Sequence, residues 1–599
     1  MKTRDAIAIV DFGGQYTHLI ANRIRRLGVY SEIVPSTVSP QQAARFKGII
    51  LSGGPFSVLD TGKPEFDPHL LDLKVPFLGL CYGHQLMAQA LGGRVMPKES
   101  REYGRAQMTI VGKCDLFNEL QASQQIWMSH GDTVVEVPDG FEVVGSSSDC
   151  RVTAMADARR HRYGLQFHPE VTDTPQGMKI LQNFLTVCGC DRTWKPEQFI
   201  EDINREIRTR CEGKKVFLLV SGGVDSTVCF ALLNKALGPS RVLGLHIDNG
   251  LMRKGESEAI LNYLKEHGFS NLIIEDASGR FLAALGGITD PEKKREIIGA
   301  MFLSVKQLAE QRLGLNINEW LLGQGTIYPD TIESAGSAHA DKIKTHHNRV
   351  NVVLELIEKG LVIEPLSQLY KDEVRLLGEK LGLPPRLVWR HPFPGPGLGV
   401  RVLCSATQSD RVDGSLEAEV TRAIAGSGYT ARVLPIKSVG VQGDARTYAH
   451  PALLDGPCDW DTLARLSTAI TNKIAGVNRV LLRIRGYSPS YRLVEAYMTK
   501  KRLDTLREID HLVKSALVNN NEYHSIWQMP VVLLPLINEA GNESIVLRPV
   551  NSQEAMTARF ASLKQETLQQ VCDGVHSIAG AGDLFYDITH KPPGTIEWE

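Results

Sequence analysis

The sequence lacks the features that would mark a membrane or secreted protein. No apolar run approaches the roughly 18 residues that cross a bilayer. The first residues, MKTRDAIAIVDFGGQ, have no long apolar core of the kind that a secretory signal needs. With 43% hydrophobic and 23% charged residues, the composition is typical of a soluble globular protein. We therefore expect a cytoplasmic protein without a membrane role.

The sequence also lacks an excess of either charge and any paired cysteine motif. Its net charge is -1, which gives no electrostatic footprint for nucleic acid, so we expect small-molecule partners and no nucleic acid. The 10 cysteines are spread through a large chain and include no CxxC pair, which argues against both a disulfide framework and a zinc site. We expect most of them to be buried, reduced thiols.

The 599 residues exceed what one hydrophobic core usually holds, and several domains are expected. Short apolar runs alternate with helical stretches as far as the Pro- and Gly-rich segment at 391–399, which no helix or central strand can continue. A polar stretch near residue 190 interrupts this pattern. We predict two consecutive doubly wound α/β domains, at 1–190 and 191–400, with largely parallel sheets.

The last third contains a diverged internal repeat. Each copy reads helix, Tyr, strand, strand, helix and strand, so that LPI at 434 corresponds to LPL at 534 and IAG at 474 to IAG at 578. The shared order of elements carries more weight than the short identities. We predict two small α+β units, at 401–500 and 501–599.

A cysteine follows a buried strand at the start of a helix in VPFLGLCYGHQ. Gly79 and Gly83 flank Cys81 at the spacing of a nucleophile elbow, and the helix dipole there favours the thiolate. A lone cysteine at a strand end is usually a structural thiol, but HPE follows a second strand and supplies His168 as a base and Glu170 to orient it. The backbone amides of Gly54 in ILSGGP and of Tyr82 are candidates for an oxyanion hole.

LSGGP, GLCYGHQ and FHPE, in this order, resemble the class I glutamine amidotransferases over about residues 5–190. The resemblance implies hydrolysis of glutamine through a thioester at Cys81. It also implies that Gln85 and the segment Ser129, His130 and Gly131 help to hold the amino acid end of glutamine.

A second glycine turn joins the strand VFLLV to a helix. The loop SGGVDST presents backbone amides and a helix N-terminus to phosphate, and the chain has no G-x-x-x-x-G-K-[ST] loop. A bare glycine turn is more often packing than a phosphate site, but the complete motif after a buried strand is more specific. Its residues are Ser221, Gly222, Gly223, Val224, Asp225, Ser226 and Thr227.

This loop resembles that of the N-type ATP pyrophosphatases, in which ATP is cleaved between its α and β phosphates and an acceptor oxygen is adenylated. The resemblance places HIDNG, with Asp248, beside the adenosine, and makes LGQGTIYPDTIES a second signature. Asp330 and Glu333 are available for Mg²⁺ or for anchoring the loop. Mg²⁺ is expected with ATP, because clustered phosphates need a cation, but no ligand set can be assigned.

The C-terminal third indicates the acceptor. HPFPGPGLG, KTHHNR, GVQGDARTY and KPPGTIEWE resemble the GMP synthase family over essentially the whole chain. The resemblance implies that glutamine, ATP and XMP are the substrates. It implies an XMP site of Asp444, Arg446, Gln528, Lys591 and Glu597. The positive and amide groups suit a nucleotide phosphate and an oxygen-rich base.

Oligomeric state and rival functions stay open at this point. The shortest members of the family carry one C-terminal dimerisation unit, whereas this chain carries two, with GDAR only in the first copy and KPPGTIEWE only in the second. We predict an internal pseudo-dimer in a monomer, with a homodimer as the alternative. The rival functions are amidation of another acceptor, such as a dinucleotide or a tRNA, and a regulatory binding protein built on relic domains.

Overall fold

The computed structural model describes most of the chain and divides it into two compact units. The described residues are 5–14, 16–195, 199–316, 318–335, 356–407, 412–442, 445–486, 488–552 and 558–599. Unit 1 comprises residues 1–202, 327–346 and 368–373, and unit 2 comprises 203–326, 347–367 and 374–599. Each unit is described separately below.

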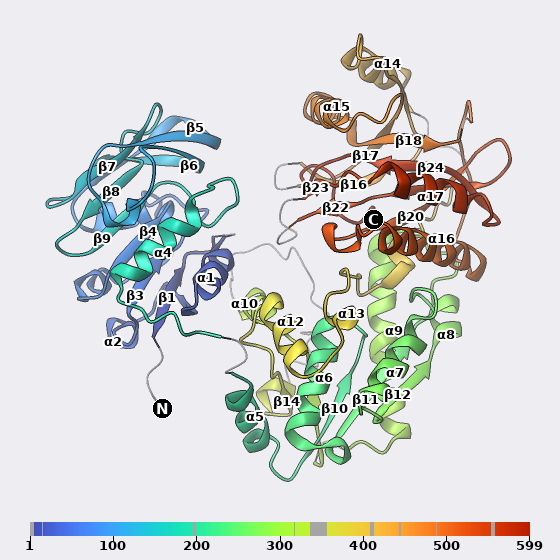
Figure 1. Cartoon of the computed structure of the whole chain (residues 1–599), viewed down its shortest axis with the longest axis horizontal. Coiled ribbons are helices and arrows are strands. Elements are labelled where there is room, and N and C mark those ends of the chain that lie inside the picture. Colours follow the sequence, from blue (N-terminus) through green and yellow to red (C-terminus); the bar gives the residue numbers. More distant parts are fainter. Residues whose placement is uncertain are drawn as a thin grey trace. The chain divides into compact units, whose positions relative to one another are not determined.

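Unit 1 is built on a nine-stranded sheet of order β2-β1-β3-β4-β9-β8-β7-β5-β6 (Figure 1). Its parallel strands are β1 (Ala6–Asp11), β2 (Tyr30–Pro35), β3 (Gly48–Leu51), β4 (Phe77–Leu80) and β9 (Arg162–Leu165). The antiparallel strands are β5 (Arg94–Ile110), β6 (Ser123–Glu136), β7 (Glu142–Ser147) and β8 (Ala154–Asp157). The helices are α1 (Thr17–Arg26), α2 (Pro40–Ala43), α3 (Tyr82–Ala90) and α4 (Gly177–Val187), with α10 (Tyr328–Ala335) from later in the chain.

The prediction of a largely parallel sheet is right for five strands of unit 1 and wrong for the other four. The run from β5 to β9 has no α-helix between its strands, only a single 3-10 turn at Asp115–Phe117. A parallel connection needs a long crossover, whereas short turns join antiparallel neighbours. The sequence signal for parallel pairing is therefore confined to the strands that alternate with helices.

Unit 2 begins with a five-stranded parallel sheet of order β12-β11-β10-β13-β14. The strands are β10 (Lys215–Leu219), β11 (Val242–Asp248), β12 (Leu272–Asp276), β13 (Trp320–Gly323) and β14 (Val362–Ile363). The helices of this region are α5 (Phe199–Arg210), α6 (Val224–Leu237), α7 (Glu256–Glu266), α8 (Ser278–Ala284), α9 (Pro291–Arg312), α12 (Lys371–Lys380) and α13 (Pro385–Val388). The order reverses beside β10, as in doubly wound nucleotide-binding folds.

The C-terminal region of unit 2 has an eight-stranded sheet whose strand path is β15-β17-β18-β24-β21-β20-β19, with β16 on β17. Its first half consists of α14 (Gly414–Ala423), β15 (Thr430–Val433), β16 (Ser438–Gln442), β17 (Ala445–Asp455), α15 (Trp460–Lys473) and β18 (Val477–Arg485). Its second half consists of β19 (Arg492–Leu493), α16 (Lys500–Asn519), β20 (Val531–Ile537), β21 (Glu543–Leu547), α17 (Gln565–Val575) and β24 (Ala581–Asp587). A separate pair is formed by β22 (Val550–Asn551) and β23 (Arg559–Phe560).

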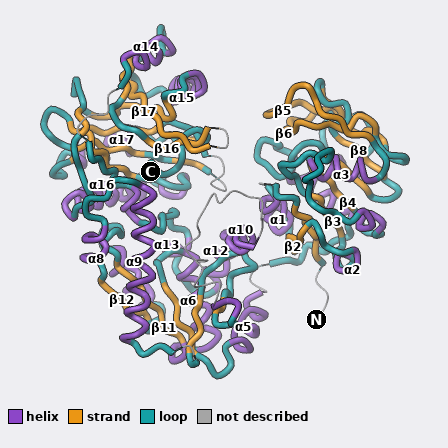
Figure 2. Tube along the Cα trace, turned by 180° about the vertical axis from the view of Figure 1, so that it is seen from behind, coloured by secondary structure: helices purple, strands orange, loops and turns teal. Residues whose placement is uncertain are grey.

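The two faces of this sheet have different covers. Leu482 and Tyr586 belong to the core cluster that includes the buried side chains of α14 to α17. Their neighbours Leu481 and Phe585 belong to a second cluster, which includes Trp598 of the C-terminal tail. Side chains alternate between the faces of a strand, so one face packs on helices and the other on the tail. Both ribbon views show α9 extending from the C-terminal region of unit 2 along the region of its parallel sheet (Figures 1 and 2).

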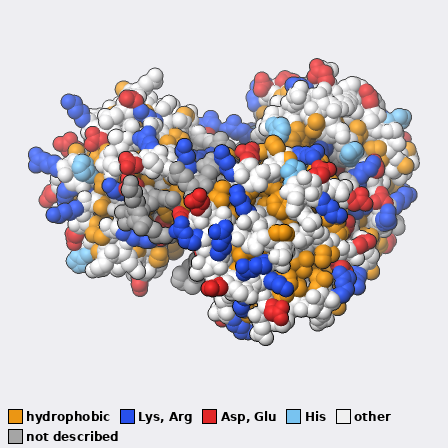
Figure 3. Space-filling model, turned by 60° about the horizontal axis from the view of Figure 1, so that its bottom comes forward, with side chains coloured by type: hydrophobic (Ala, Val, Ile, Leu, Met, Phe, Trp, Pro, Cys, Tyr) orange, Lys and Arg blue, Asp and Glu red, His pale blue; other side chains and the backbone are white. Residues whose placement is uncertain are grey.

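The surface and the helices agree with the composition. Acidic and basic side chains are intermingled on the face drawn in Figure 3, as the net charge of -1 suggests. Within the part of the chain that the structure describes, no helix combines the length and the apolar character that a membrane crossing requires.

Candidate active sites

Cys81 lies on a strained turn between β4 and α3. Its backbone has φ 50 and ψ −104, a conformation that few side chains adopt. A Cβ on Gly79 would lie 2.5 Å from the carbonyl oxygen of Gly83, and a Cβ on Gly83 would lie 2.3 Å from that of Leu51. Only glycine permits these close approaches, so the turn has the geometry that the sequence predicts for a nucleophile elbow.

The sheet order brings the three amidotransferase motifs together. β3, β4 and β9 are adjacent and parallel, and each is followed by one motif. A Cβ built on Gly53 would lie 3.2 Å from Cε1 of His168 and 3.8 Å from Cβ of Cys81. Segments more than a hundred residues apart therefore meet at the carboxyl edge of one sheet, where α/β sites form.

His168 and Glu170 form a buried pair beside Cys81. Nδ1 of His168 donates to Oε1 of Glu170 at 2.7 Å, and the two residues are 5% and 1% exposed. Burial alone would lower the pKa of His168, but the charge of Glu170 and the neighbouring Cys81 outweigh it and raise this pKa to about 10. The imidazole is thus held in its protonated form beside the sulfur.

Several neighbours of this group were not identified from the sequence. Nε of Arg23 donates to the carbonyl of Glu170 at 3.1 Å, and Oγ1 of Thr174 donates to that of His168 at 2.7 Å. Nε2 of Gln166 lies 3.8 Å from Sγ of Cys81. Gln166 is in the strand-end segment YGLQF, which could have signalled it, whereas Arg23 is on α1 and carries no local signal.

The predicted glutamine-binding residues lie beside the same cysteine. Sγ of Cys81 donates to the carbonyl of Ser129 at 3.4 Å. Nε2 of Gln85 donates to the carbonyl of Asp132 at 2.7 Å, and Nδ1 of His130 donates to that carbonyl at 2.8 Å. Ser129, His130 and Gly131 are consecutive residues of β6, so the structure places this predicted group against the elbow.

The SGGVDST loop closes on itself between β10 and α6. The hydroxyl oxygens of Ser221 and Ser226 are 3.1 Å apart, and the amide of Gly223 donates to Ser221 Oγ at 3.2 Å. Oγ1 of Thr227 donates to the Gly223 carbonyl at 2.8 Å. Gly222 has φ +80, and a Cβ there would lie 2.2 Å from Cδ1 of Ile260. Val224 and Asp225 begin α6, whose N-terminus favours anions.

This loop lies at the switch point of its sheet. β11 and β13 are on opposite sides of β10, and in such sheets ligands bind where the strand order reverses. A Cβ on Gly325, in the predicted second signature, would lie 2.9 Å from the amide nitrogen of Ser226. Asp248 ends the neighbouring β11, and its Oδ1 accepts from the amide of Gly250 at 2.9 Å. The structure thus brings three of the predicted adenylating segments together.

The predicted acceptor residues are only partly within the described structure. Asp444 lies outside the described residues, as do the side chains of Arg446 and Glu333 and the segment KTHHNR. Glu597 accepts hydrogen bonds from Nε and Nη2 of the buried Arg401 at 3.0 and 2.8 Å. Nε2 of Gln528 donates to the same carboxylate at 3.4 Å. Arg401 was missed because HPFPGPGLGVR contains no motif for this role.

The C-terminal tail docks against two parts of the C-terminal region. The amide of Val439 donates to the carbonyl of Trp598 at 3.1 Å, and the amide of Val441 donates to that of Pro593 at 2.7 Å. The backbone of Lys591 exchanges hydrogen bonds with that of Ala558 at 2.7 and 3.1 Å. The tail therefore lies beside β16, which leads into the GDAR segment.

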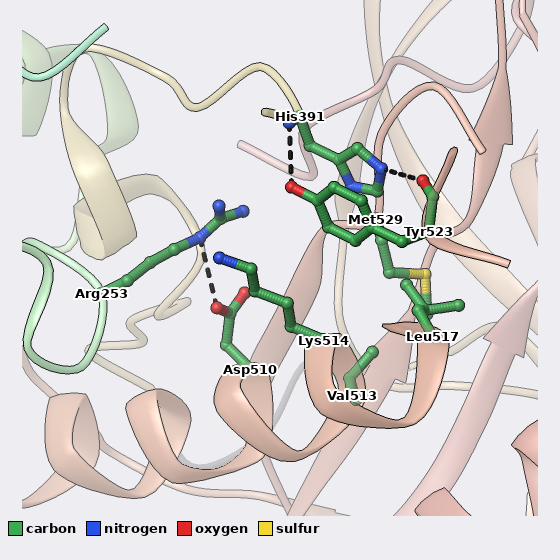
Figure 4. Close-up of a pocket in the computed structure, with 8 residues that line it drawn as sticks. All are labelled: Arg253, His391, Asp510, Val513, Lys514, Leu517, Tyr523 and Met529. Carbon is green, nitrogen blue, oxygen red and sulfur yellow. Dashed lines mark hydrogen bonds and ion pairs between the residues drawn. The ribbon is translucent and has the colours of Figure 1, made fainter. Parts of the chain in front are cut away.

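A charged pocket lies between the nucleotide-binding region and α16 (Figure 4). Nε of Arg253 pairs with Oδ2 of Asp510 at 3.2 Å, with Lys514 one helical turn further along α16. The ring of His391 stacks on Tyr523 with centroids 4.0 Å apart, and burial lowers the pKa of His391 to about 4. Burial also lowers the pKa of Lys514. Arg253 follows HIDNG closely, so the pocket borders the predicted adenosine side.

Comparison with known proteins gives one consistent group. Residues 8–188 match the family glutamine amidotransferase class-I, 197–283 match NAD synthase, and 515–598 match the GMP synthase C terminal domain. A protein of Leptospira interrogans, named as a probable glutamine-hydrolysing GMP synthase, is 45% identical over 615 residues and covers 100% of both chains. Glutamine-hydrolysing GMP synthases of Syntrophomonas wolfei and Thermobifida fusca are 42% and 43% identical, over 81% and 82% of this chain and 98% and 97% of theirs.

Proposed function

The chain belongs to the family of glutamine-hydrolysing GMP synthases, and from this we propose that it converts XMP to GMP with ATP and with ammonia from glutamine. The observation that carries the proposal is the 45% identity that extends over 100% of the chain, including the tail. The class I amidotransferase match and the adenylating loop supply the two chemistries that this reaction needs.

Ammonia is made at the elbow of unit 1. The Cys81 thiolate attacks the side-chain amide carbon of glutamine, while protonated His168 gives its proton to the departing ammonia. The amides of Gly54 and Tyr82 stabilise the tetrahedral oxyanion. Water then releases glutamate, with His168 as the base and Glu170 holding its orientation. The pKa of about 10 at His168 supports a protonated imidazole as the proton donor.

Amination takes place in unit 2. The loop of Ser221 to Thr227 holds the β and γ phosphates, which leave as pyrophosphate when the 2-oxygen of XMP attacks the α phosphorus. Asp248 lies on the adenosine side, and Arg253 and Lys514 line the neighbouring pocket. Ammonia then displaces AMP at carbon 2 to give GMP.

Mg²⁺ bound with ATP would supply the positive charge that offsets the phosphates when pyrophosphate leaves. Asp225 begins α6 and Asp248 ends β11, so single carboxylates adjoin the loop. This donor set fits Mg²⁺, which usually binds nucleotide phosphates with one or two carboxylates and several waters. We assign the protein ligands to this pair as part of the proposal.

XMP binds between the tail and the first copy of the repeat. Lys591 and Arg446 provide positive charge for its phosphate, and Gln528, Asp444 and Glu597 provide polar contacts to the nucleotide. The shared hydrogen bonding of Gln528 and Glu597 supports their inclusion in one site. The backbone pairing of Val441 with Pro593 supports the approach of the GDAR segment to the tail.

The C-terminal region is a duplicated dimerisation unit, at 401–500 and 501–599, that closes into a pseudo-dimer within one chain. The strand path β15-β17-β18-β24-β21-β20 supports this. In the repeat, β15, β17 and β18 correspond to β20, β21 and β24, so the path meets corresponding strands in the same order from either end. β17 and β18 are parallel, as are β21 and β24, and the central β18 and β24 are antiparallel. The two shorter relatives cover 81% and 82% of this chain, which also fits an extra unit.

The division of labour is tested with Cys81→Ala. We expect this variant to lose glutamine-dependent GMP synthesis and to keep ammonium-dependent synthesis at about the level of the unmodified protein. Dinucleotide and tRNA acceptors assayed in parallel test the rival substrates. Loss of both nitrogen sources in the variant, or amination of another acceptor in place of XMP, would overturn the proposal.

The pseudo-dimer is tested by light scattering after gel filtration, with and without XMP. If the two copies pair with each other within one chain, we expect a monomer in at least one of these conditions. An obligate dimer through the C-terminal region in every condition would exclude the internal arrangement.

A further inference from the structure

The junction of β18 and β24 has an internal twofold relationship. Leu482 pairs with Tyr586, and on either side Leu481 faces Asp587 and Arg483 faces Phe585. IAGVNRVLLRI and IAGAGDLFYDI align without a gap, so that Leu482 corresponds to Tyr586. The pseudo-twofold axis therefore passes through this pair, and the residues of β18 from Val477 to Arg483 have counterparts in β24, Ala581 to Asp587.

Three pairs of corresponding residues carry opposite charges. The alignment of β18 with β24 matches Arg479 with Asp583 and Arg483 with Asp587. The parallel registers Leu454 to Leu482 and Leu547 to Tyr586 make the next residues along, Asp455 and Arg548, correspond as well. All six are on the face that the tail covers, because they keep the alternation of Leu481 and Phe585.

These residues make two networks that mirror each other with the signs exchanged. In the first, Asp587 pairs with Arg479 of the other copy at 2.8 Å and with Arg548 of its own copy at 2.8 Å. In the second, Arg483 pairs with Asp583 of the other copy at 3.9 Å and with Asp455 of its own copy. In each network, an aromatic side chain also donates a hydrogen bond to the aspartate that pairs with the other copy. Nε1 of Trp598 donates to Asp587 at 3.0 Å, and the hydroxyl of Tyr491 donates to Asp583 at 2.6 Å.

Pairing of like copies would reverse the sign of the cross-copy contacts. If two first copies met through β18, Arg479 of one would face Arg483 of the other. If two second copies met through β24, Asp583 would face Asp587. The contacts within each copy would be unchanged. Side chains of Arg479, Asp587 and Arg548 are fully buried, so such like charges would meet with little water to screen them.

We propose that this charge inversion specifies the partner of each C-terminal copy, so that β18 accepts β24 and rejects a second β18. The proposal rests on the duplicated unit proposed above. Buried ion pairs often add little net stability compared with apolar side chains, but they discriminate between alternative pairings. In a symmetric homodimer each residue meets a different residue of the identical partner, here Arg479 against Arg483 or Asp583 against Asp587, and both of these contacts join like charges.

Pairing of unlike copies also decides where the acceptor site forms. Nη2 of Arg479 donates to Oγ1 of Thr595 at 2.7 Å and to the carbonyl of Glu597 at 2.9 Å. Nε of Arg548 donates to the carbonyl of Thr595 at 2.8 Å. The first network therefore holds the tail in place as well as joining the strands. Because only the first copy has GDAR and only the second has the tail, each chain assembles one composite site.

A charge-symmetric chain tests the proposal. The triple variant Asp455→Arg, Arg483→Asp and Asp583→Arg gives both copies the same charge at all three positions and keeps the ion pairs within the two networks attractive, although Arg432, 3.9 Å from Asp455, then faces a like charge. The second network is chosen because neither its ion pairs nor its hydrogen bonds involve the tail. Leu482→Cys on the axis is the reporter, because residue 482 meets its own counterpart only when two first copies pair.

The full chain with Leu482→Cys is unfolded and refolded at high concentration with oxidised glutathione, in the native and charge-symmetric backgrounds. We expect about tenfold more dimer linked through position 482 in the symmetric background. The same proteins without Leu482→Cys correct for other disulfides. Equal amounts of this dimer in both backgrounds would overturn the proposal.

Thermal unfolding provides the second measurement. Arg483→Asp alone places three acids together and should lower the midpoint by roughly 5 °C, and the triple variant should regain most of that loss. Arg485→Asp is the control, because Arg485 donates to the carbonyl of Cys572 and pairs with no acid in the described structure. Failure of the triple variant to recover would show that charge does not select the pairing. GMP synthesis by the unmodified chain tests the proposed function separately.

Discussion

Nδ1 of His168 donates a 2.7 Å hydrogen bond to Oε1 of Glu170, and the pair is almost completely buried beside Cys81. The charge of Glu170 makes the largest contribution that offsets the burial of the imidazole. This contact connects the fold to the chemistry, because adjacent parallel strands bring the cysteine and the histidine to one sheet edge.

Glu170→Gln should lower both the rate and the upper pH limit of glutamine hydrolysis. A raised histidine pKa keeps the imidazolium present until the pH rises through the folded value, here about 10. Without the Glu170 charge this pKa falls, so the alkaline limb of the profile should move to lower pH. We also expect a fall in kcat of about 100-fold. An unchanged profile would separate Glu170 from the histidine.

Gly83→Ala should disable glutamine hydrolysis by closing the elbow. The new Cβ would lie 2.3 Å from the carbonyl oxygen of Leu51, a backbone atom that cannot move alone. We expect glutamine-dependent synthesis to fall by about 100-fold, since small displacements of a nucleophile cost this much. Gly62→Ala is the matched control, because no atom lies within 4 Å of the added carbon. Ammonium-dependent synthesis should survive in both variants.

Gly222→Ala should affect the other half of the reaction. Its φ of +80 is unfavourable for alanine, and the added carbon would lie 2.2 Å from Ile260 Cδ1. GMP synthesis should fall by about 10-fold or more with glutamine and with ammonium alike. Gly299→Ala has no atom within 4 Å and should leave both rates unchanged. A defect confined to glutamine would argue against a phosphate role for the loop.

Asp587→Asn should destabilise unit 2 in a manner that depends on pH. Burial raises the pKa of Asp587, but Arg548 and Arg479 outweigh this and lower it. A carboxylate with a depressed pKa stabilises the fold above its unfolded pKa of about 3.9, and this contribution is lost as the pH falls through the folded value. At pH 7 the variant should lose about 3–5 kcal/mol, because two buried guanidinium groups lose their counter-charge. Calorimetry at several pH values measures this, with the exposed Asp573→Asn as control.

The elements of the sites could be predicted where the signal is local. Glycines and strand ends within about ten residues predict the geometry of three segments: the turn at Cys81, the HPE segment and the SGGVDST loop. The antiparallel half of the first sheet could not be predicted as readily, because pairing depends on turns and register. The sequence also could not predict that Arg401 contacts Glu597 or that Arg23 contacts Glu170, because each contact joins residues far apart in the chain.

The repeat shows both the reach of sequence patterns and their limit. The order of elements and the match of IAG at 474 with IAG at 578 are readable from the chain. The opposite charges of Arg479 and Asp583 can be interpreted only with the register of β18 and β24, which shows which residues of the two strands face each other. Without the sheet order, this difference between corresponding residues would look like ordinary sequence divergence at the surface.

The products formed from ATP show whether the chain adenylates XMP and then aminates it. Purified protein is incubated with ATP, Mg²⁺ and ammonium, with and without XMP, and the nucleotides are separated by chromatography. We expect AMP, pyrophosphate and GMP in equal amounts, all dependent on XMP. Release of ADP and phosphate, or of AMP without any dependence on XMP, would contradict it.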